Sequence, residues 1–351
     1  AFVGRSHRSE QGQGKINQLM DLSREILGLP KSYLIGMVPG SDTGAVEMAI
    51  WSLLGPRKVE VLAWDAFGKE WLHDIVSQLK ISHVKTTAPY GHLPDLSSVD
   101  FDCDVVFTWN GTTAGVKVPN GDWIPNDRKG LTIVDATSAC FAMALPWKKL
   151  DVVTFSFQKA LGGEAAHGVM VLSPRAIKRL ESHQPSWPIP KLFRMTVNGR
   201  FNRKVFSGFT INTPSMLVVE DAIDALKWAK SFGGLPALIA RSEDNLNVVK
   251  SWIQKSPFYE FLAVKPDTIA STSITLKIVD EWFADKDYIH RVLIVNEIAR
   301  LLEEENVAFD VISHRDAPPG LRVWAGPTIN TDDLEVLLPW LDWAYSETAR
   351  A

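Results

Sequence analysis

The sequence predicts an α/β protein, with a large domain built on a mixed, mostly parallel sheet and a smaller C-terminal α/β domain. One reason is that short apolar runs, rich in Val, Ile, Leu and Phe, alternate with amphipathic stretches between residues 33 and 173. The other is size, because 351 residues with 46% hydrophobic and 22% charged side chains are enough for two domains that share a sizeable core.

Five apolar runs in this first half are expected to be buried strands. They cover residues 59–64, 104–109, 131–136, 151–157 and 168–173. Amphipathic stretches at 44–55 and 68–80 are expected to be helices between them. Right-handed crossovers between parallel strands bring the carboxyl ends of the strands to one edge of the sheet, where the sites of such folds lie. The residues that directly follow these strands are therefore the first candidates for a site.

The second half of the chain is expected to be helical at first and then α/β again. The proline-rich segment 182–191 is irregular by composition. Helical patterns follow at 216–234, where a Gly-Gly pair suits a helix end, and at 240–256. The smaller domain then has strand, helix and strand patterns at 272–280, 288–306 and 321–326. We divide the chain into domains 1–255 and 256–351.

The overall charge and the cysteines argue against several classes of function. A net charge of −4 does not favour nucleic acid or an anionic membrane as a partner. Two cysteines without paired spacing predict neither a disulfide framework nor a metal site, and they suit a reducing, cytoplasmic location. No apolar run approaches the roughly eighteen residues of a membrane span, and the first residues do not form a signal peptide.

Lys159 follows the buried strand 151–157 after a single residue, Gln158, and precedes Ala, Leu and a Gly-Gly pair. A lysine at the mouth of a buried strand, among apolar neighbours, is placed where its amine loses water. Desolvation lowers the pKa of an ammonium group, and a neutral amine can form a Schiff base. A solvated lysine that caps a strand has the same local pattern, so the pattern by itself leaves both interpretations open.

Asp135 lies at the end of another buried strand, in the run LTIVDATSAC. A carboxylate in this place can pair with a protonated pyridine nitrogen, which keeps the ring electron-withdrawing. The ordinary alternatives are a helix N-cap and a turn residue. The position of Asp135 alone does not distinguish these roles.

A glycine-flanked turn at 39–44 opens the helix expected from about residue 45. Its residues Ser41, Asp42 and Thr43 stand at the helix N-terminus, where backbone N–H groups and hydroxyls can form an anion-binding site. The turn has neither the Gly-Lys-Ser/Thr ending of a Walker motif nor the GxGxxG pattern of a dinucleotide site. A plain turn is the alternative.

Two further positions complete a set of groups for one planar, phosphorylated cofactor. The strand at 104–109 is followed by Asn-Gly-Thr-Thr, whose Thr112 can hydrogen bond to a ring hydroxyl. Phe67 can stack on the ring, and Trp64 is its rival. Together with the turn, Asp135 and Lys159, these residues predict a phosphate cup, a stacking ring, a hydroxyl partner, a pyridinium partner and an imine-forming lysine.

Basic residues near the two ends of the chain predict how a substrate is bound. His7 and Arg8 form one pair, His314 and Arg315 form another, and Arg322 lies on an expected strand. Such pairs are usually solvated. Two of them together with Arg322, however, suit a substrate with two anionic ends, because guanidinium groups bind carboxylate and phosphate oxygens in a bidentate way.

With these motifs the chain resembles the phosphoserine aminotransferases, within the class-V, fold-type-I group of pyridoxal-phosphate enzymes. The resemblance runs from about Gly4 to Arg322. Its most specific motifs are Ser-His-Arg at 6–8, Asn-Gly-Thr-Thr-Ala-Gly at 110–115, Gln-Lys at 158–159, Asn-Thr-Pro at 212–214 and His-Arg…Gly-Leu-Arg at 314–322.

The resemblance implies roles for the candidates around the ring and for those that bind substrate. Lys159 is expected to hold pyridoxal 5′-phosphate as a Schiff base, Asp135 to meet the ring nitrogen and Thr112 to lie near the ring hydroxyl. The two His-Arg pairs and Arg322 are expected to bind the phosphate and the carboxylate of the substrate.

The resemblance also implies a homodimer with shared active sites. Gln158 and the backbone of Asp42 and Thr43 are expected to hold the cofactor phosphate, helped by Asn212 and Thr213 from the partner subunit. Neither chain of such a dimer would contain a whole site by itself.

The chain departs from the family pattern at three places. The family turn commonly reads Gly-Gly-Gly-Arg-Gly, whereas this chain has Gly-Ser-Asp-Thr-Gly, with Thr43 in place of an arginine. The stacking residue is commonly Trp, and Phe67 is the best match here. The family also has a segment ahead of Ser-His-Arg, while five residues precede that motif in this sequence, so we expect a truncated N-terminal segment.

The implied function is amino transfer from glutamate to 3-phosphohydroxypyruvate, giving phosphoserine and 2-oxoglutarate in serine biosynthesis. Both substrates carry two anionic groups, which suits the two basic clusters. One alternative is another class-V enzyme, such as an alanine–glyoxylate or serine–pyruvate aminotransferase, whose small substrates need no distal anion site. The other is a non-catalytic homologue that binds the cofactor. Use of the phosphorylated threonine analogue of pyridoxine biosynthesis stays open.

Overall fold

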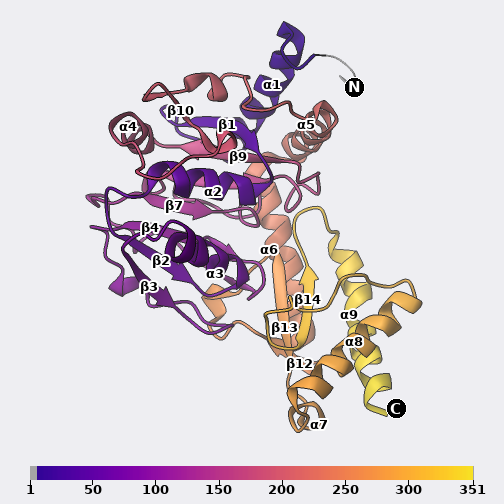
Figure 1. Cartoon of the computed structure of the whole chain (residues 1–351). Helices are drawn as coiled ribbons and strands as arrows, with labels where there is room; N and C mark the ends of the chain where they lie inside the picture. The colour runs from indigo at the N-terminus through magenta and orange to yellow at the C-terminus, as the bar shows by residue number, and fades with distance from the viewer. Residues whose placement is uncertain (1–5, 351) are drawn as a thin grey trace.

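A seven-stranded sheet forms the middle of the large domain in the computed structural model, which describes residues 6–350 (Figure 1). Its strands lie in the order β1-β9-β8-β7-β4-β2-β3. All neighbours pair in parallel except β9, which is antiparallel to both β1 and β8. The strand bounds are β1 (Leu34–Pro39), β2 (Val59–Ala63), β3 (His83–Thr87), β4 (Asp104–Thr108), β7 (Thr132–Asp135), β8 (Val152–Ser156) and β9 (His167–Leu172).

This sheet confirms the predicted fold class and all five predicted strands of the large domain. The two strands that the sequence pattern did not identify are at the edges of the sheet. β3 reads HVKTT, and its alternating exposed and half-buried side chains lack the apolar run of a buried strand. β1 reads LIGMVP and is mostly buried, but a glycine interrupts its apolar run and it ends at Pro39 beside the glycine turn.

Helices cover both faces of the sheet. One face packs against α2 (Asp42–Leu53), α3 (Ala66–His73) and α4 (Pro174–Ser182) in one hydrophobic core. The other face packs in a second core against α1 (Glu10–Leu27) and α5 (Met216–Ser231). The predicted helices at 44–55 and 68–80 are confirmed, although α3 changes into a π-helical turn at Asp74–Gln78.

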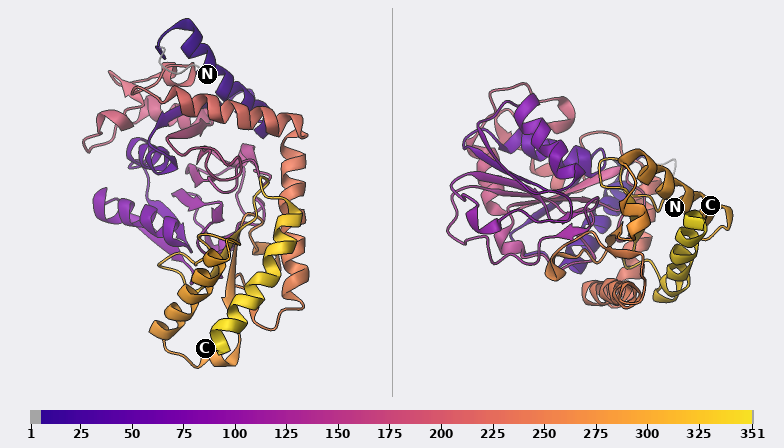
Figure 2. Two further views of the ribbon diagram at one scale, coloured as in Figure 1. Left: turned by 90° about the vertical axis from the view of Figure 1, so that its right-hand side faces the viewer. Right: turned by 90° about the horizontal axis from the view of Figure 1, so that it is seen from below.

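A long helix connects the large domain to the small one. α5 ends just before Gly233 and Gly234, which have φ angles of 119° and 69° that suit glycine. α6 (Gly234–Ile253) begins at once and runs along the molecule into the small domain (Figure 2). The predicted helix at 240–256 therefore starts too late, because the apolar residues before it already form the first turns of α6.

The small domain holds a three-stranded antiparallel sheet and three helices of its own. Its strands are β12 (Tyr259–Phe261), β13 (Ser273–Ile278) and β14 (Gly320–Trp324), and its helices are α7 (Glu281–Ala284), α8 (Tyr288–Glu304) and α9 (Thr331–Arg350). The strand, helix and strand expected after residue 272 are confirmed as β13, α8 and β14. α9 packs against both α6 and α8. The boundary at residue 255 lies between α6 and β12, and it stays a prediction.

The remaining elements are short. Two hairpins pair β5 (Asn110–Gly111) with β6 (Val116–Lys117) and β10 (Thr196–Val197) with β11 (Arg200–Phe201). The proline-rich segment 182–191 is mostly irregular, as predicted. No helix within residues 6–350 combines the length and the apolar character that a membrane crossing requires.

A buried ion pair fixes the start of β8, the strand that leads to Lys159. The Asp151 carboxylate accepts hydrogen bonds from Arg128 Nη2 at 3.0 Å, Arg175 Nη1 at 3.2 Å and the Thr132 N–H at 3.1 Å. The side chains of Arg128 and Asp151 are 2% and 1% exposed. A carboxylate so enclosed depends on its partners, because a buried charge without compensation is costly.

We expect Arg128→Ala to destabilise the protein by about 3–5 kcal/mol, the usual cost of removing one partner of a buried ion pair. The neighbouring Lys129→Ala is the matched control, since its 2.9 Å ion pair with Asp102 is 63% exposed on both sides. That change should cost less than about 1 kcal/mol. The free energy of unfolding in urea measures both, and equal losses in the two variants would contradict this role of Arg128.

Candidate active site

Four strand ends meet in one pocket of the large domain. Asp135 ends β7, Lys159 lies three residues beyond β8, Thr112 follows β4, and the turn after β1 leads into α2. The structure brings eight candidates together there: Ser41, Asp42, Thr43, Phe67, Thr112, Asp135, Gln158 and Lys159 all line this pocket. The convergence results from the sheet, because β1, β4, β7 and β8 all run in the same direction.

The Asp135 carboxylate is held by two donors from the protein. Oδ1 accepts the backbone N–H of Thr137 at 3.1 Å, and Oδ2 accepts the indole N–H of Trp71 at 3.2 Å. Trp71 is 3% exposed and lies on the inner face of α3. Sequence reasoning missed Trp71, because a tryptophan inside an amphipathic helix has the ordinary pattern of a core residue. These contacts fix the direction of the carboxylate in the pocket.

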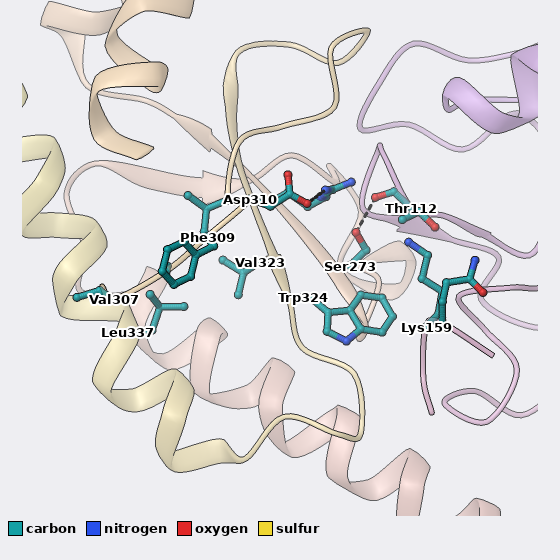
Figure 3. Close-up of a pocket in the computed structure, with 13 residues that line it drawn as sticks. Thr112, Lys159, Ser273, Val307, Phe309, Asp310, Val323, Trp324 and Leu337 are labelled. Carbon is teal, nitrogen blue, oxygen red and sulfur yellow. Dashed lines mark hydrogen bonds and ion pairs between the residues drawn. The ribbon is translucent and has the colours of Figure 1, made fainter. Parts of the chain in front are cut away.

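Lys159 has the environment of a reactive amine. Burial is the main cause that lowers the pKa of its side chain, and the positive charge of Arg322 lowers it further. The carboxylates of Asp135 and Asp310 oppose the shift. The Lys159 amine lies 5.7 Å from the centre of a Trp324 ring, and Figure 3 shows both side chains at the same end of an adjoining pocket. A lowered pKa increases the neutral, nucleophilic fraction of the amine.

The turn before α2 offers donors to an anion. Ser41 occupies the N-cap position, and its side chain makes no capping hydrogen bond within the described chain, so it does not use up the N–H groups of the first turn. The turn packs closely against Gly168. A residue with a Cβ atom at position 168 would clash, because that atom would lie only 2.5 Å from the Ser41 carbonyl oxygen. The Asp42 N–H donates to the Ser156 hydroxyl at 3.2 Å. That amide, expected to hold phosphate, is therefore already paired in this structure.

Phe67, and not Trp64, reaches the pocket. Trp64 is completely buried, and its indole N–H donates to the Val116 carbonyl at 3.0 Å. Phe67 is half-buried and lines the pocket, and its ring centre lies 6.2 Å from that of His314. His314 therefore approaches the same site from the small domain. Its neighbour Arg315 has an 81% exposed side chain.

Arg322 opens onto a second, adjoining pocket of about 490 Å³ between the two domains (Figure 3). Thr112, Gln158 and Lys159 line both pockets, so the two are continuous. Arg322 Nη2 lies 3.2 Å from Oδ2 of Asp310. A guanidinium group that already holds a carboxylate at this place has the geometry to bind the carboxylate of a ligand.

His7 and Arg8 do not join Arg322 within one chain. They line a separate pocket of about 540 Å³ together with Asn212 and Thr213. None of the residues around this pocket is shared with the Lys159 pocket. Most of the predicted residues thus lie in two separate pockets. One contains Lys159, and the other contains His7 and Arg8, expected to bind substrate, with Asn212 and Thr213, expected to act across a dimer.

His167 links the segment that follows Thr213 to the turn before α2. Its Nε2 accepts the backbone N–H of Ser215 at 2.9 Å, and its backbone bridges to Gly40 in the turn before α2. Burial lowers the pKa of His167, which favours the neutral ring that this hydrogen bond requires. Sequence reasoning missed His167, since a lone histidine at the start of a buried strand carries no motif.

Comparisons with known proteins complete the description of the site. No family model matches the chain. A curated phosphoserine aminotransferase of Methanosarcina mazei is 54% identical over 346 residues, which cover 98% of this chain and 91% of the relative.

Solved structures share the fold at lower identity. A phosphoserine aminotransferase from Cytophaga hutchinsonii has a TM-score of 0.82 at 20% identity, and the match covers 96% of this chain and 90% of that chain. An alanine–glyoxylate aminotransferase from Nostoc sp. has a TM-score of 0.80 at 18% identity, covering 97% and 89%. Because these two structures are named for different activities, the fold alone does not distinguish them.

Proposed function

The chain belongs to the phosphoserine aminotransferase family, and on this premise we propose that its Lys159 pocket binds pyridoxal 5′-phosphate and carries out the reaction of the family. That reaction transfers the amino group of glutamate to 3-phosphohydroxypyruvate and gives phosphoserine and 2-oxoglutarate, in serine biosynthesis. The observation that carries the proposal is the convergence of Lys159, Asp135 and the turn before α2 in one pocket.

The donor set of the pocket fits this cofactor. Asp135 suits the ring nitrogen, Thr112 the ring hydroxyl and Phe67 the face of the ring. Several buried polar atoms around the pocket have no hydrogen-bond partner within residues 6–350, among them Gln158 Oε1, Asn110 Oδ1 and the Thr108 hydroxyl. Buried polar atoms without partners are rare in native proteins, and a polar ligand supplies such partners.

The phosphate of the cofactor suits the turn before α2. The first turn of this helix presents backbone N–H groups and the positive end of the helix dipole, and Ser41 and Thr43 add hydroxyls. We propose that these groups and Gln158 hold the phosphate. Asn212 and Thr213 of the partner subunit would complete the set.

Each residue of the pocket then has a chemical role. Pyridoxal phosphate supplies a ring that stabilises negative charge at the substrate α-carbon. The Asp135 carboxylate keeps the ring nitrogen protonated, because an adjacent negative charge favours the charged form. The Lys159 amine, with its pKa lowered by burial, would move a proton between the substrate α-carbon and the C4′ atom of the cofactor. Arg322 orients the substrate by its carboxylate.

The distal anion of the substrate distinguishes this function from that of an alanine–glyoxylate enzyme. We propose that His314 and Arg315 bind this group next to Phe67, with His7 and Arg8 contributed by the partner subunit. A substrate such as alanine has no group for these residues. We also propose a cytoplasmic location, as the cysteine content suggests.

We propose a homodimer with shared sites, and the separation of the two groups of residues supports it. Within residues 6–350, none of the candidates for the cofactor ring lines the pocket with His7, Arg8, Asn212 and Thr213, and neither His7 nor Arg8 lines the Lys159 pocket. In a dimer with two-fold symmetry, the first pocket of each chain can face the second pocket of its partner, so the same contact forms twice in one isologous interface. We propose that each pocket of this kind faces the Lys159 pocket of the partner.

We expect Arg8→Ala and Arg315→Ala each to lower kcat/KM for phosphoserine about 10- to 150-fold, the cost of one charged hydrogen bond of roughly 1.5–3 kcal/mol. Alanine as amino donor should be affected much less, because it lacks the distal anion. Arg300→Ala, on the surface of α8 in ion pairs with Glu297 and Glu304, is the control and should change neither donor. Equal losses for both donors would mean that Arg8 and Arg315 are structural or bind only the common carboxylate.

A mixing experiment tests the shared site. Lys159→Ala and Thr213→Glu homodimers should both be inactive, the second because a carboxylate opposes the cofactor phosphate. If Thr213 acts across the interface, a mixed dimer has one doubly damaged site and one intact site. Random reassociation makes about half of the dimers mixed, so roughly a quarter of wild-type activity should return. No recovery, with subunit exchange and folding confirmed, would refute sharing.

A further inference from the structure

The side chain of Asp42 is buried in a place where an acid is unexpected. Asp42 is the first residue of α2, yet it is only 5% exposed. Its Oδ1 has no hydrogen-bond partner among the atoms of residues 6–350. The carboxyl groups of Asp42 and Asp135 line the same pocket, and the charge of Asp135 and a side-chain hydrogen bond to it are among the causes that raise the pKa of Asp42. The turn Gly-Ser-Asp-Thr-Gly, which departs from the family pattern, thus places a second carboxyl group beside the proposed partner of the ring nitrogen.

Among the described residues, no Lys, Arg or His side chain is among the groups that shift the pKa of Asp42. From β7 and the segment after it, Asp135, the Thr137 hydroxyl and the Cys140 thiol face this carboxyl, and the Thr154 hydroxyl faces it from β8. Lys159 lines the same pocket, and its charge interacts with that of Asp135. Two carboxylates in contact at a buried site repel each other, so the pair retains one proton.

Asp42 is the member of the pair that keeps this proton. Burial, and then the charge of Asp135, raise the pKa of Asp42 well above its ordinary value, while the hydroxyls of Thr137 and Thr154 oppose the shift only in part. The proposed phosphate site gives a second reason. A negative charge on Asp42, between Ser41 and Thr43, would repel an anion bound at the first turn of α2.

We propose that Asp42 is a neutral carboxylic acid that donates a hydrogen bond to the Asp135 carboxylate, and that it is a positioning residue for the ring nitrogen of the cofactor. This inference rests on the proposed function for the role of Asp135. Asp42 does not touch the reacting atoms. Asp42 holds the Asp135 carboxylate, which pairs with the ring nitrogen. Because Asp42 is neutral, it adds no negative charge to the phosphate site.

Three donors then fix the Asp135 carboxylate. The Thr137 N–H binds Oδ1, the Trp71 indole N–H binds Oδ2, and the Asp42 hydroxyl joins them from α2. They come from three different elements, so the carboxylate cannot turn without breaking contacts with one of them. Another buried acid, Asp65, acts on Asp135 from a distance, but the Gly68 N–H binds its own carboxyl at 2.8 Å.

The proposal makes a signed prediction about stability and pH. The folded chain binds the Asp42 proton more tightly than the unfolded chain does, because the folded pKa is raised above the ordinary value of 3.8. The contribution of Asp42 to stability is therefore complete below that ordinary value. It is lost as the pH rises through the raised pKa.

Two variants of the full chain separate this role from simple packing. Asp42→Asn keeps the shape and an N–H donor but cannot ionise, whereas Asp42→Ala removes the donor. Without added cofactor, the melting temperature of the wild type should fall relative to that of Asp42→Asn as the pH is raised from 5 to 9, by on the order of 2 °C. Asp332→Asn, an exposed acid in the first turn of α9, is the control and should run parallel to the wild type.

Pyridoxal phosphate itself is the probe for the positioning role. Asp42→Ala should weaken its binding, followed by absorbance, about 10- to 150-fold. Asp42→Asn should stay within a few-fold of the wild type, because its amide still binds Asp135.

Parallel melting curves for the wild type and Asp42→Asn would overturn the proposal, and so would equal losses of affinity in the two variants. A wild type that binds no pyridoxal phosphate would refute the proposed function instead. The melting curves would still decide whether Asp42 is neutral.

Discussion

The common direction of β1, β4, β7 and β8 is the constraint on which the rest of this structure depends. It brings the residues after four strands to one edge of the sheet, where they meet although they are far apart in the chain. The opposite ends of these strands carry the structural charges, with Asp151 bound to Arg128 and Asp104 bound to Arg179. The ion pairs at the amino ends of the strands therefore stabilise the fold, while the polar groups at the carboxyl ends are free to bind a ligand.

Charge balance within the pocket decides what those groups can do. Lys159 reacts only as a neutral amine, and burial together with Arg322 favours that form. In the proposed site Asp135 pairs with the ring nitrogen, and the N–H groups of Thr137 and Trp71 hold its carboxylate in place. A protonated Asp42 reconciles this charge with a phosphate at the start of α2. The same buried environment thus lowers one pKa and raises another, because desolvation acts against the charged form in both cases.

Site residues that directly follow a strand could be predicted from the sequence. Those that reach the site only through the packing of helices and strands could not. Asp135 and Lys159 were identifiable because an apolar strand points to the residue after it. Trp71 and His167 were not, because their contacts depend on how α3 and β9 lie in the folded chain. The turn before α2 was predicted as an anion site, but the inward direction of the Asp42 side chain comes from packing. Edge strand β3 was missed for a related reason: its polar sequence reflects exposure to solvent.

The covalent role of Lys159 is the central claim, and chemical trapping tests it most directly. Borohydride reduction of the protein with bound pyridoxal phosphate, followed by peptide mapping, should place the cofactor on Lys159. Lys159→Ala should fold, lose the reducible adduct and lose essentially all turnover. An adduct on another lysine, in the wild type or in this variant, would contradict the account.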